Sequence, residues 1–355
     1  MSKLKSFILI ICLTAGLARH SYGQDLHFSQ YGETPFTINP ALAAVAYDIR
    51  VITNYKNQWA SVASPYKSFG FSGEFGLKYR KLNKSYLSTG LNVYRDVAGD
   101  SKMGTTHVDI TLGGVVKAGK YSKLSAAILG GVTTKSIDYT ALRWENQYDG
   151  YMYDAALSSG ETQATNNYTY GDFAGGLNWH YSKSEQYISA DHGTRFDIGG
   201  SVFHINQPKQ SYLKNSSEKQ YMKYVGYANF FIGAKGSNVG FAPGIVYMMQ
   251  GPSTEILASA MFKYIIQDQS VYTGLVKPCA LSLGASYRYK DAFIPTMLFE
   301  YDKYAFGVSY DVNLSTLTTA SKSKGGLEIA LRYNWNPGYG KMLGGSLTRP
   351  TYKNQ

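Results

Sequence analysis

Residues 68–79, "SFGFSGEFGLKY", determine the fold class of this chain. Apolar side chains recur there at every second position, and Ser, Gly, Glu and Lys fill the positions between them. The apolar face consists of Phe69, Phe71, Phe75, Leu77 and Tyr79, with Gly73 among them. Because successive side chains of a strand point to opposite faces, this pattern predicts a β-strand with one apolar and one polar face. The polar face would meet water in a soluble sandwich and the lumen in a membrane barrel.

The same alternation recurs along the chain, and we expect about fourteen strands. They are 47–59, 66–80, 86–94, 106–117, 124–137, 168–182, 194–206, 223–235, 238–250, 254–267, 279–290, 292–301, 303–313 and 325–336. An even number of strands of about ten residues suits a bacterial outer-membrane barrel. The prediction is therefore an all-β, antiparallel transmembrane β-barrel over residues 47–336.

Composition favours the membrane barrel over the soluble sandwich. The 355 residues include 32 Tyr, 16 Phe and 37 Gly, and only 17% are charged. After Gln24 no stretch approaches 18 consecutive apolar residues, so no transmembrane helix is expected. A closed barrel satisfies its backbone within the sheet and can still span a bilayer. A soluble sandwich would need a second domain to hold fourteen strands, and no linker marks one.

Residues 1–23, "MSKLKSFILIICLTAGLARHSYG", have the pattern of a signal peptide. Two lysines precede about a dozen apolar residues, too few to serve as a membrane anchor. Cleavage after Gly23 removes three basic residues and lowers the formal net charge from +11 to +8. It leaves Cys279 as the only cysteine, which excludes an intrachain disulfide. Export and scattered basic residues argue against nucleic-acid binding.

The connections predict how the barrel is oriented. The two longest, 138–167 and 207–222, both follow odd-numbered strands, whereas several connections after even-numbered strands are short. Outer-membrane barrels have short periplasmic turns and long outer loops. We therefore expect an outer-membrane location with the N-terminus in the periplasm.

The first long loop is rich in aromatic residues, with Trp144, Tyr148, Tyr151 and Tyr153 close together. Aromatic side chains are frequent anchors of protein interfaces. The loop is either a recognition surface for a partner or a lid packed over the barrel mouth.

The sequence predicts no catalytic, metal or cofactor site. The histidines of the expected mature chain are His27, His107, His180, His192 and His204. They form no close metal-binding pair, and one cysteine is not enough for a zinc site. Asn178 and His180 share a strand face, as two members of a hydrolase triad could, but no serine can be assigned to them. We expect a protein that is not an enzyme.

The segment "QDLHFSQYGETPFTINPALAA", residues 24–44, resembles the start of the PorP/SprF family of outer-membrane proteins, which belong to the type IX secretion system of Bacteroidetes. The resemblance rests on His27, Phe28, Ser29, Gln30 and Tyr31, followed by Asn39, Pro40 and Ala41. It continues in "YKNQW" (55–59), "HINQP" (204–208) and residues 306–335. Two features depart from the family. Ala44 stands where many members have Gly, and the tail 337–355 is longer than usual.

The resemblance implies a barrel that acts in secretion. Some members support the secretion or surface attachment of a specific large partner, such as a motility adhesin. Others act with the core machinery and a periplasmic peptidoglycan-associated protein. The expected surroundings are thus type IX components, a large secreted surface protein and outer-membrane lipid, with no catalytic activity.

Residues 24–46 suit irregular structure. Pro35 and Pro40 donate no backbone hydrogen bond and restrict the residues before them. We expect a plug inside the lumen, a contact with periplasmic machinery, or both. The residues of this segment that we expect to bind a partner are His27, Phe28, Ser29, Gln30, Tyr31, Asn39 and Pro40. Two other functions stay open: a transporter for small hydrophobic molecules and a simple porin. Glu74, Lys78, Asp109 and Lys117 on the predicted luminal face would allow a polar channel, whereas a plug argues against an open one.

Overall fold

The computed structural model describes residues 25–61, 64–77, 85–160, 166–183, 186–187, 190–191, 193–212, 218–234, 237–267, 276–316 and 318–335. The predicted signal peptide 1–23 and the tail 337–355 lie outside these ranges, as do Lys78 and His192. Among the described residues, no helix has the length and apolar character needed to cross a membrane.

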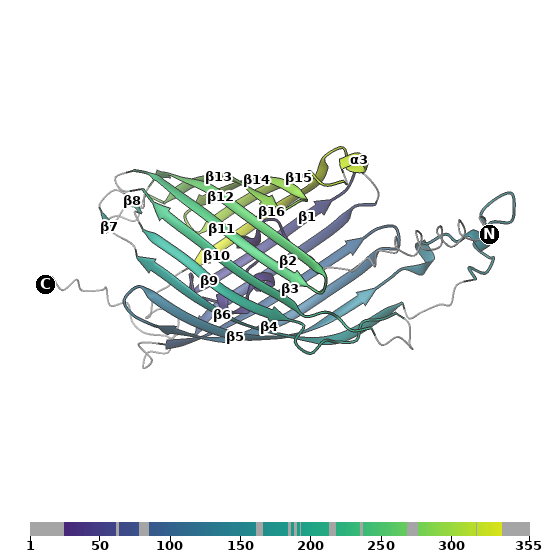
Figure 1. Ribbon diagram of the computed structural model, residues 1–355, viewed down its shortest axis with the longest axis horizontal. Helices are drawn as coiled ribbons and strands as arrows, with labels where there is room; N and C mark the ends of the chain where they lie inside the picture. The colour runs from purple at the N-terminus through teal and green to yellow at the C-terminus, as the bar shows by residue number, and fades with distance from the viewer. Residues whose placement is uncertain are drawn as a thin grey trace, which may run out of the picture.

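Fourteen antiparallel strands close into one barrel (Figure 1). Each pairs with its chain neighbours, and β1 pairs with β16 to close the wall. The strands are β1 (Ile49–Gln58), β2 (Tyr66–Leu77), β3 (Ser85–Ala98), β4 (Met103–Lys117), β5 (Ser122–Ser136), β6 (Asn167–Lys183), β9 (Thr194–Phe203), β10 (Lys223–Gly233), β11 (Val239–Gln250), β12 (Ser253–Gln267), β13 (Cys279–Arg288), β14 (Ala292–Tyr301), β15 (Tyr304–Asn313) and β16 (Lys324–Trp335). The predicted barrel and its strands are confirmed.

A small hairpin, β7 (Gln186–Tyr187) with β8 (Ala190–Asp191), stands apart from the wall between β6 and β9. The sequence pattern did not predict it, because strands of two residues are too short to show a period.

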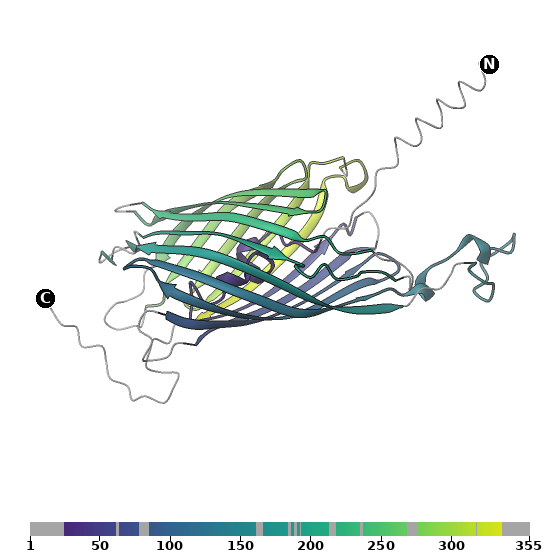
Figure 2. The ribbon, with the colours of Figure 1, turned by 60° about the horizontal axis from the view of Figure 1, so that its bottom comes forward.

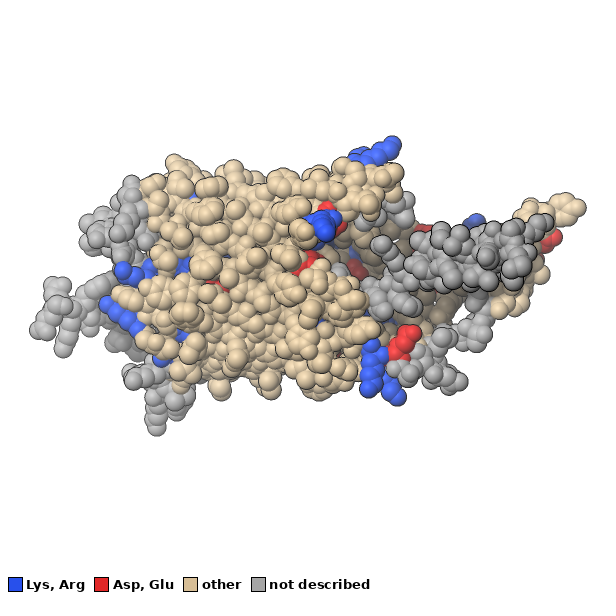
Figure 3. All heavy atoms as spheres, in the orientation of Figure 1, with Lys and Arg blue, Asp and Glu red and all other residues tan. Residues whose placement is uncertain are grey.

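The alternation in β2 divides lipid-facing from luminal side chains. Phe69 and Leu77 are 51% and 56% exposed on the outer surface, whereas Ser72 and Glu74 are buried inside. The same holds around the barrel, so most of the visible wall carries no charged side chain (Figure 3). Bulky apolar groups outside and polar groups inside are what a bilayer requires of a barrel.

The two ends of the barrel differ. One end carries the connections 137–166, 204–222 and 314–323, the last of which contains α3 (Thr318–Ser321) (Figure 1). We call it the loop end. The opposite end carries tight connections such as 118–121 and 302–303, together with the longer connections 184–193 and 268–278, and we call it the turn end.

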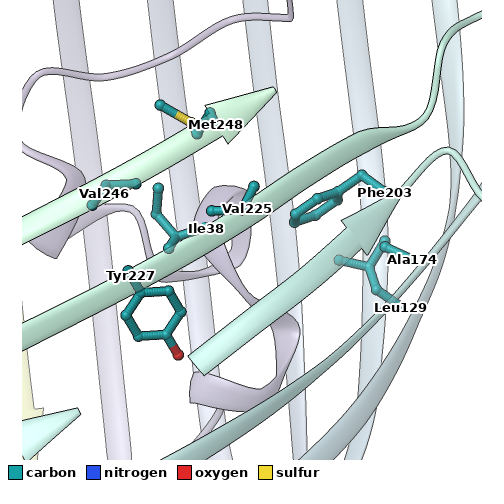
Figure 4. Packing of buried hydrophobic residues seen from close by; sticks show 8 residues of the cluster. All are labelled: Ile38, Leu129, Ala174, Phe203, Val225, Tyr227, Val246 and Met248. Atoms are coloured by element: carbon teal, nitrogen blue, oxygen red, sulfur yellow. The ribbon is translucent and has the colours of Figure 1, made fainter. Parts of the chain in front are cut away.

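Residues 25–46 run through the barrel interior and are here called the luminal segment (Figure 2). The segment forms three short turns of helix: η1 (Tyr31–Glu33), α2 (Pro35–Ile38) and η2 (Pro40–Leu42). Pro35 and Pro40 each occupy the first helical position, where a missing N–H costs nothing. Ile38 packs into a cluster of wall side chains (Figure 4) that consists of Leu129, Ala174, Phe203, Val225, Tyr227, Val246 and Met248.

The direction of the segment separates two expectations from the sequence. Asp25 accompanies Gln250 at the loop end, and Asp48 binds Gly76 at the turn end, where β1 begins. Asp25 lies at the loop end, so it cannot lie on the periplasmic side if the long loops lie outside the cell. In that orientation the start of β1, at the turn end, faces the periplasm.

Candidate functional site

The luminal segment is bound by charged side chains of the wall. The backbone N–H groups of Ser29 and Gln30 donate to the Glu328 carboxylate at 2.7 and 2.9 Å. The Ser29 hydroxyl donates to Asp311 at 2.7 Å and accepts from Arg288 at 2.8 Å. Hydrogen bonds to charged partners are roughly twice as strong as neutral ones. Two adjacent residues therefore form a strong attachment point.

Lys56 completes this cluster of buried charges. Its Nζ lies 3.7 Å from Asp311 and 3.9 Å from Glu328, and it donates to the carbonyl of His27 at 3.2 Å. Removing charges from water is costly unless they are paired and hydrogen-bonded. The cations of Lys56 and Arg288 meet the carboxylates of Asp311 and Glu328 here, and Arg288 also pairs with Glu255 and Asp291. The segment supplies donors and acceptors between these charges.

A second ion-pair network anchors the segment at η1. Arg332 forms an ion pair with Glu33 of the segment and lies 2.8 Å from Glu300 of β14. The guanidinium thus joins two wall strands to the segment.

Asn39 is fully buried and uses its whole side-chain amide. Its Nδ2 donates to the carbonyls of Leu177 and Gly200 on adjacent strands, at 2.8 and 3.2 Å, and lies 3.1 Å from the Tyr227 hydroxyl. Its Oδ1 accepts from the N–H of Ala41 at 2.8 Å and so caps η2. An amide meets these demands because it carries donors and an acceptor on one small group.

Tyr31 reaches the wall through its hydroxyl. The hydroxyl donates to Asn229 at 2.9 Å and lies 2.7 Å from the Ser259 hydroxyl. Its ring packs against both Leu257 and the Ile38 cluster.

Wall glycines make room for these side chains. A Cβ at four luminal positions would come within 2.0–2.3 Å of a segment atom. The pairs are Gly90 with Phe36, Gly176 with Asn39, Gly244 with Tyr31, and Gly307 with Gln30. The wall is thus shaped to this one segment.

The turn-end part of the segment is held through its backbone. The N–H of Ala44 donates to Glu74 at 2.7 Å, and its carbonyl accepts from the Tyr86 hydroxyl at 2.8 Å. Ala44 has a φ of +54°, in the left-handed region that favours glycine. This conformation explains why Gly suits the position where this chain departs from the family pattern.

At the loop end, His204 joins Asp25 to the wall. Its Nε2 lies 2.5 Å from Asp25, and its Nδ1 lies 2.8 Å from Asp172 of β6. Burial lowers the pKa of His204, but the two carboxylates outweigh burial and raise it to about 9. Burial has the opposite effect on a carboxylate and raises the pKa of Asp25, but the positive charges of His204 and Lys223 bring this pKa far below its usual range. An imidazolium between two carboxylates therefore clamps the segment at neutral pH.

The stretches that carry the family resemblance meet at this segment. Lys56 comes from "YKNQW", His204 from "HINQP", and Asp311, Glu328 and Arg332 from residues 306–335. Each contacts residues 25–33. The sequence predicted the segment and placed Glu74 on the luminal face, but it did not identify these five residues as partners of the segment. The available signal was a charged residue at a luminal position of an alternating strand.

The predicted binding residues fall into two separate groups. His27, Phe28, Ser29, Gln30, Tyr31, Asn39 and Pro40 all lie in the lumen. Phe28 to Gln30, Asn39 and Pro40 are buried, and His27 lies 3.4 Å from Glu255. Trp144, Tyr148, Tyr151 and Tyr153 lie in the connection between β5 and β6, which projects away from the barrel at the loop end (Figure 2).

We call residues 137–160 of this connection the arm. Asp149 accepts from the N–H groups of Tyr151 and Met152, both at 2.7 Å, and an isolated bridge joins Tyr148 to Tyr153. Tyr151 is 91% exposed, and Tyr148 and Met152 are also largely exposed. Trp144 is partly buried. The arm presents an apolar tip on a hydrogen-bonded hairpin.

The residues considered for catalysis have structural contacts. His180 Nδ1 lies 2.8 Å from Asp197, and Asn178 accepts from the Tyr227 hydroxyl at 2.9 Å. Across the described ranges, no group of three or more His, Cys, Asp or Glu side chains is placed to hold a metal ion.

Residues 20–333 match the family described as type IX secretion system membrane protein PorP/SprF. The chain belongs to the PorP/SprF family. It is therefore an outer-membrane β-barrel of type IX secretion. No curated protein matches the sequence.

Several solved barrels are similar in fold to this PorP/SprF protein. The toluene transporter TbuX from Ralstonia pickettii is 10% identical, with 86% of this chain and 94% of that chain covered and a TM-score of 0.45. BamA from Haemophilus ducreyi, lacking POTRA domains 1–3, is 8% identical, with 81% and 70% covered and a TM-score of 0.39. CdiB from Acinetobacter baumannii is 9% identical, with 81% and 60% covered and a TM-score of 0.38.

Proposed function

We propose that this PorP/SprF protein supports the secretion, surface attachment, or both, of one specific large partner protein, such as an adhesin, without being an enzyme. In this proposal the loop end faces the outside and the turn end faces the periplasm. The arm binds the secreted partner. Type IX components, and a periplasmic peptidoglycan-associated protein, meet the barrel from the periplasmic side.

The exposed aromatic tip of the arm carries the proposal. Tyr148, Tyr151 and Met152 present apolar surface to solvent on a hairpin that its own hydrogen bonds order. Aromatic side chains that are already ordered lose little entropy when they bind, which makes them good interface anchors. An arm that projects from the barrel favours the recognition surface over the lid.

The filled lumen supports a role other than that of an open porin. The luminal segment contacts strands all around the wall, from β2 through Glu74 to β16 through Glu328. A passage for solutes would require this segment to move.

Co-purification tests the proposal. The tagged protein is extracted from its native outer membrane in mild detergent after cross-linking in cells, and its companions are identified by mass spectrometry. We expect one very large surface protein together with type IX components. A variant with Tyr148, Tyr151 and Tyr153 changed to Ala should lose the surface protein and keep the barrel.

Tyr289→Ala is the matched control, because Tyr289 is an exposed aromatic residue at the loop end outside the arm. It should retain the surface protein. A wild-type barrel that remains unaccompanied after cross-linking would contradict the proposal, as would an arm variant with unchanged companions.

A further inference from the structure

A cavity of about 260 Å³ lies between the luminal segment and strands β10–β14. Residues 29–33 form its inner side. Ala242, Met261 and Leu298 line its outer side from three strands, β11, β12 and β14. An apolar cavity of about 150 Å³ is enough to hold benzene, so this cavity has room for a larger apolar group.

Ala242, Met261 and Leu298 are less buried than apolar side chains elsewhere on the luminal face of β11. Elsewhere on β11, the luminal Val246 and Met248 are buried beneath Ile38. Ala242, Met261 and Leu298 are only partly buried, although they face the same lumen. Covering apolar surface is worth about 25 cal/mol per Å². The segment thus leaves uncovered an apolar site that a ligand would stabilise.

The wall is interrupted beside the cavity. The β10–β11 ladder runs through Asn229–Gly244, skips the next two pairs, and resumes at Ile232–Phe241. Pro243 lies in the skipped pairs and has no N–H to donate. Phe230 and Pro243 occupy outward positions of their strands and still line the cavity. The cavity therefore lies against one of the two places where a ladder of the described wall skips two consecutive pairs; the other lies between β14 and β15, at Pro295.

We propose that this cavity binds an alkyl chain, which reaches it from the bilayer at the β10–β11 interruption. The chain belongs either to a free medium-chain fatty acid or to a membrane lipid. Its methylenes pack on Met261, Leu298 and Ala242, and the ring of Tyr31 closes the inner side. This site is separate from the arm and does not depend on the role in secretion.

Photolabelling tests the site in the full-length protein in lipid nanodiscs. The probe is a medium-chain fatty acid with a diazirine on its chain, and tandem mass spectrometry maps the labelled residues. We expect label on Tyr31, Met261 and Leu298 themselves, with competition by the unlabelled acid. Met261→Trp fills the cavity and should reduce this label about tenfold, the effect of losing roughly 1.4 kcal/mol of affinity.

Phe262→Trp is the control, because Phe262 neighbours Met261 and faces outward. It should leave the luminal label unchanged. Leu298→Trp is a second filling variant, and each variant is first checked for resistance of the barrel to unfolding in SDS before heating. Label confined to outward-facing residues would overturn the proposal, and so would luminal label that stays at the wild-type level in both filling variants.

A second probe carries the same diazirine chain within a phospholipid. Luminal label from this probe would identify the occupant as a lipid acyl chain. Luminal label from the free acid alone would identify a small apolar molecule.

Discussion

Asn39 sits directly over Gly176, with its Oδ1 2.0 Å from the point that a Cβ at that glycine would occupy. The amide reaches the carbonyls of Leu177 and Gly200 only because Gly176 has no side chain to keep it away from the wall. A residue of the luminal segment and a wall glycine 137 positions away in the sequence therefore form one fitted contact.

Gly176→Ala should displace the luminal segment. The new methyl group would overlap Asn39, and overpacking of this kind costs about 1–3 kcal/mol. We expect faster hydrogen exchange in residues 35–45, measured by mass spectrometry. Gly226→Ala is the control, because a Cβ at Gly226 meets nothing within 4 Å. Equal exchange in the two variants would refute the fitted contact.

Asn39→Asp should be more damaging than Asn39→Ala, although Asp is nearly isosteric with Asn. A carboxylate would face two backbone carbonyls with no proton to donate and would be buried without a cation among the hydrogen-bond partners of Asn39. Leaving a buried charge unpaired costs about 3–5 kcal/mol, against about 1–3 for the lost hydrogen bonds. Thermal unfolding of the barrel, followed by its shift on SDS gels, would rank the two variants. The reverse order would contradict this account of the site.

Attachment of the loop-end part of the segment should weaken as pH rises through about 9. The pKa of His204 is raised to about 9 from an ordinary value near 6.5, so protonated His204 stabilises the bound segment. This contribution is fully present below about pH 6.5 and is lost as pH rises through 9. The pKa of Asp25 is lowered, so its contribution persists well into the acid range.

Hydrogen exchange of residues 25–31 between pH 7 and 10, corrected for the intrinsic rate, measures this loss. In His204→Gln the segment should be held more loosely at pH 7 and should lack the transition near pH 9. The same transition in this variant would assign it to a group other than His204.

Substitutions at Ala44 should follow its left-handed backbone. Ala44→Gly should change unfolding stability by less than about 1 kcal/mol, because relief of the positive φ offsets the loss of a buried methyl group. Ala44→Val should destabilise by more than 1 kcal/mol, because a β-branched residue is strained at this φ. Urea denaturation in detergent would compare them. A Val variant as stable as the Gly variant would show that the conformation imposes no constraint.

Local pattern was enough to predict the strands. The alternation in residues 68–77 predicted which side of β2 meets lipid and which meets the lumen, and the structure confirms it for Phe69 and Glu74. The same pattern located all fourteen wall strands, because a strand with different surroundings on its two faces must repeat every second residue. It did not locate β7 and β8, because strands of two residues are too short to show a repeat.

The sequence by itself determined the barrel, the family and the irregular course of residues 25–46, because alternation, motifs and prolines act over short distances along the chain. Only the tertiary structure decided what those residues bind. Ser29 and Glu328 are 299 positions apart and meet because β16 closes on β1. No local pattern records such a contact. It depends on barrel closure, which brings luminal charges and glycines from distant strands around a single segment.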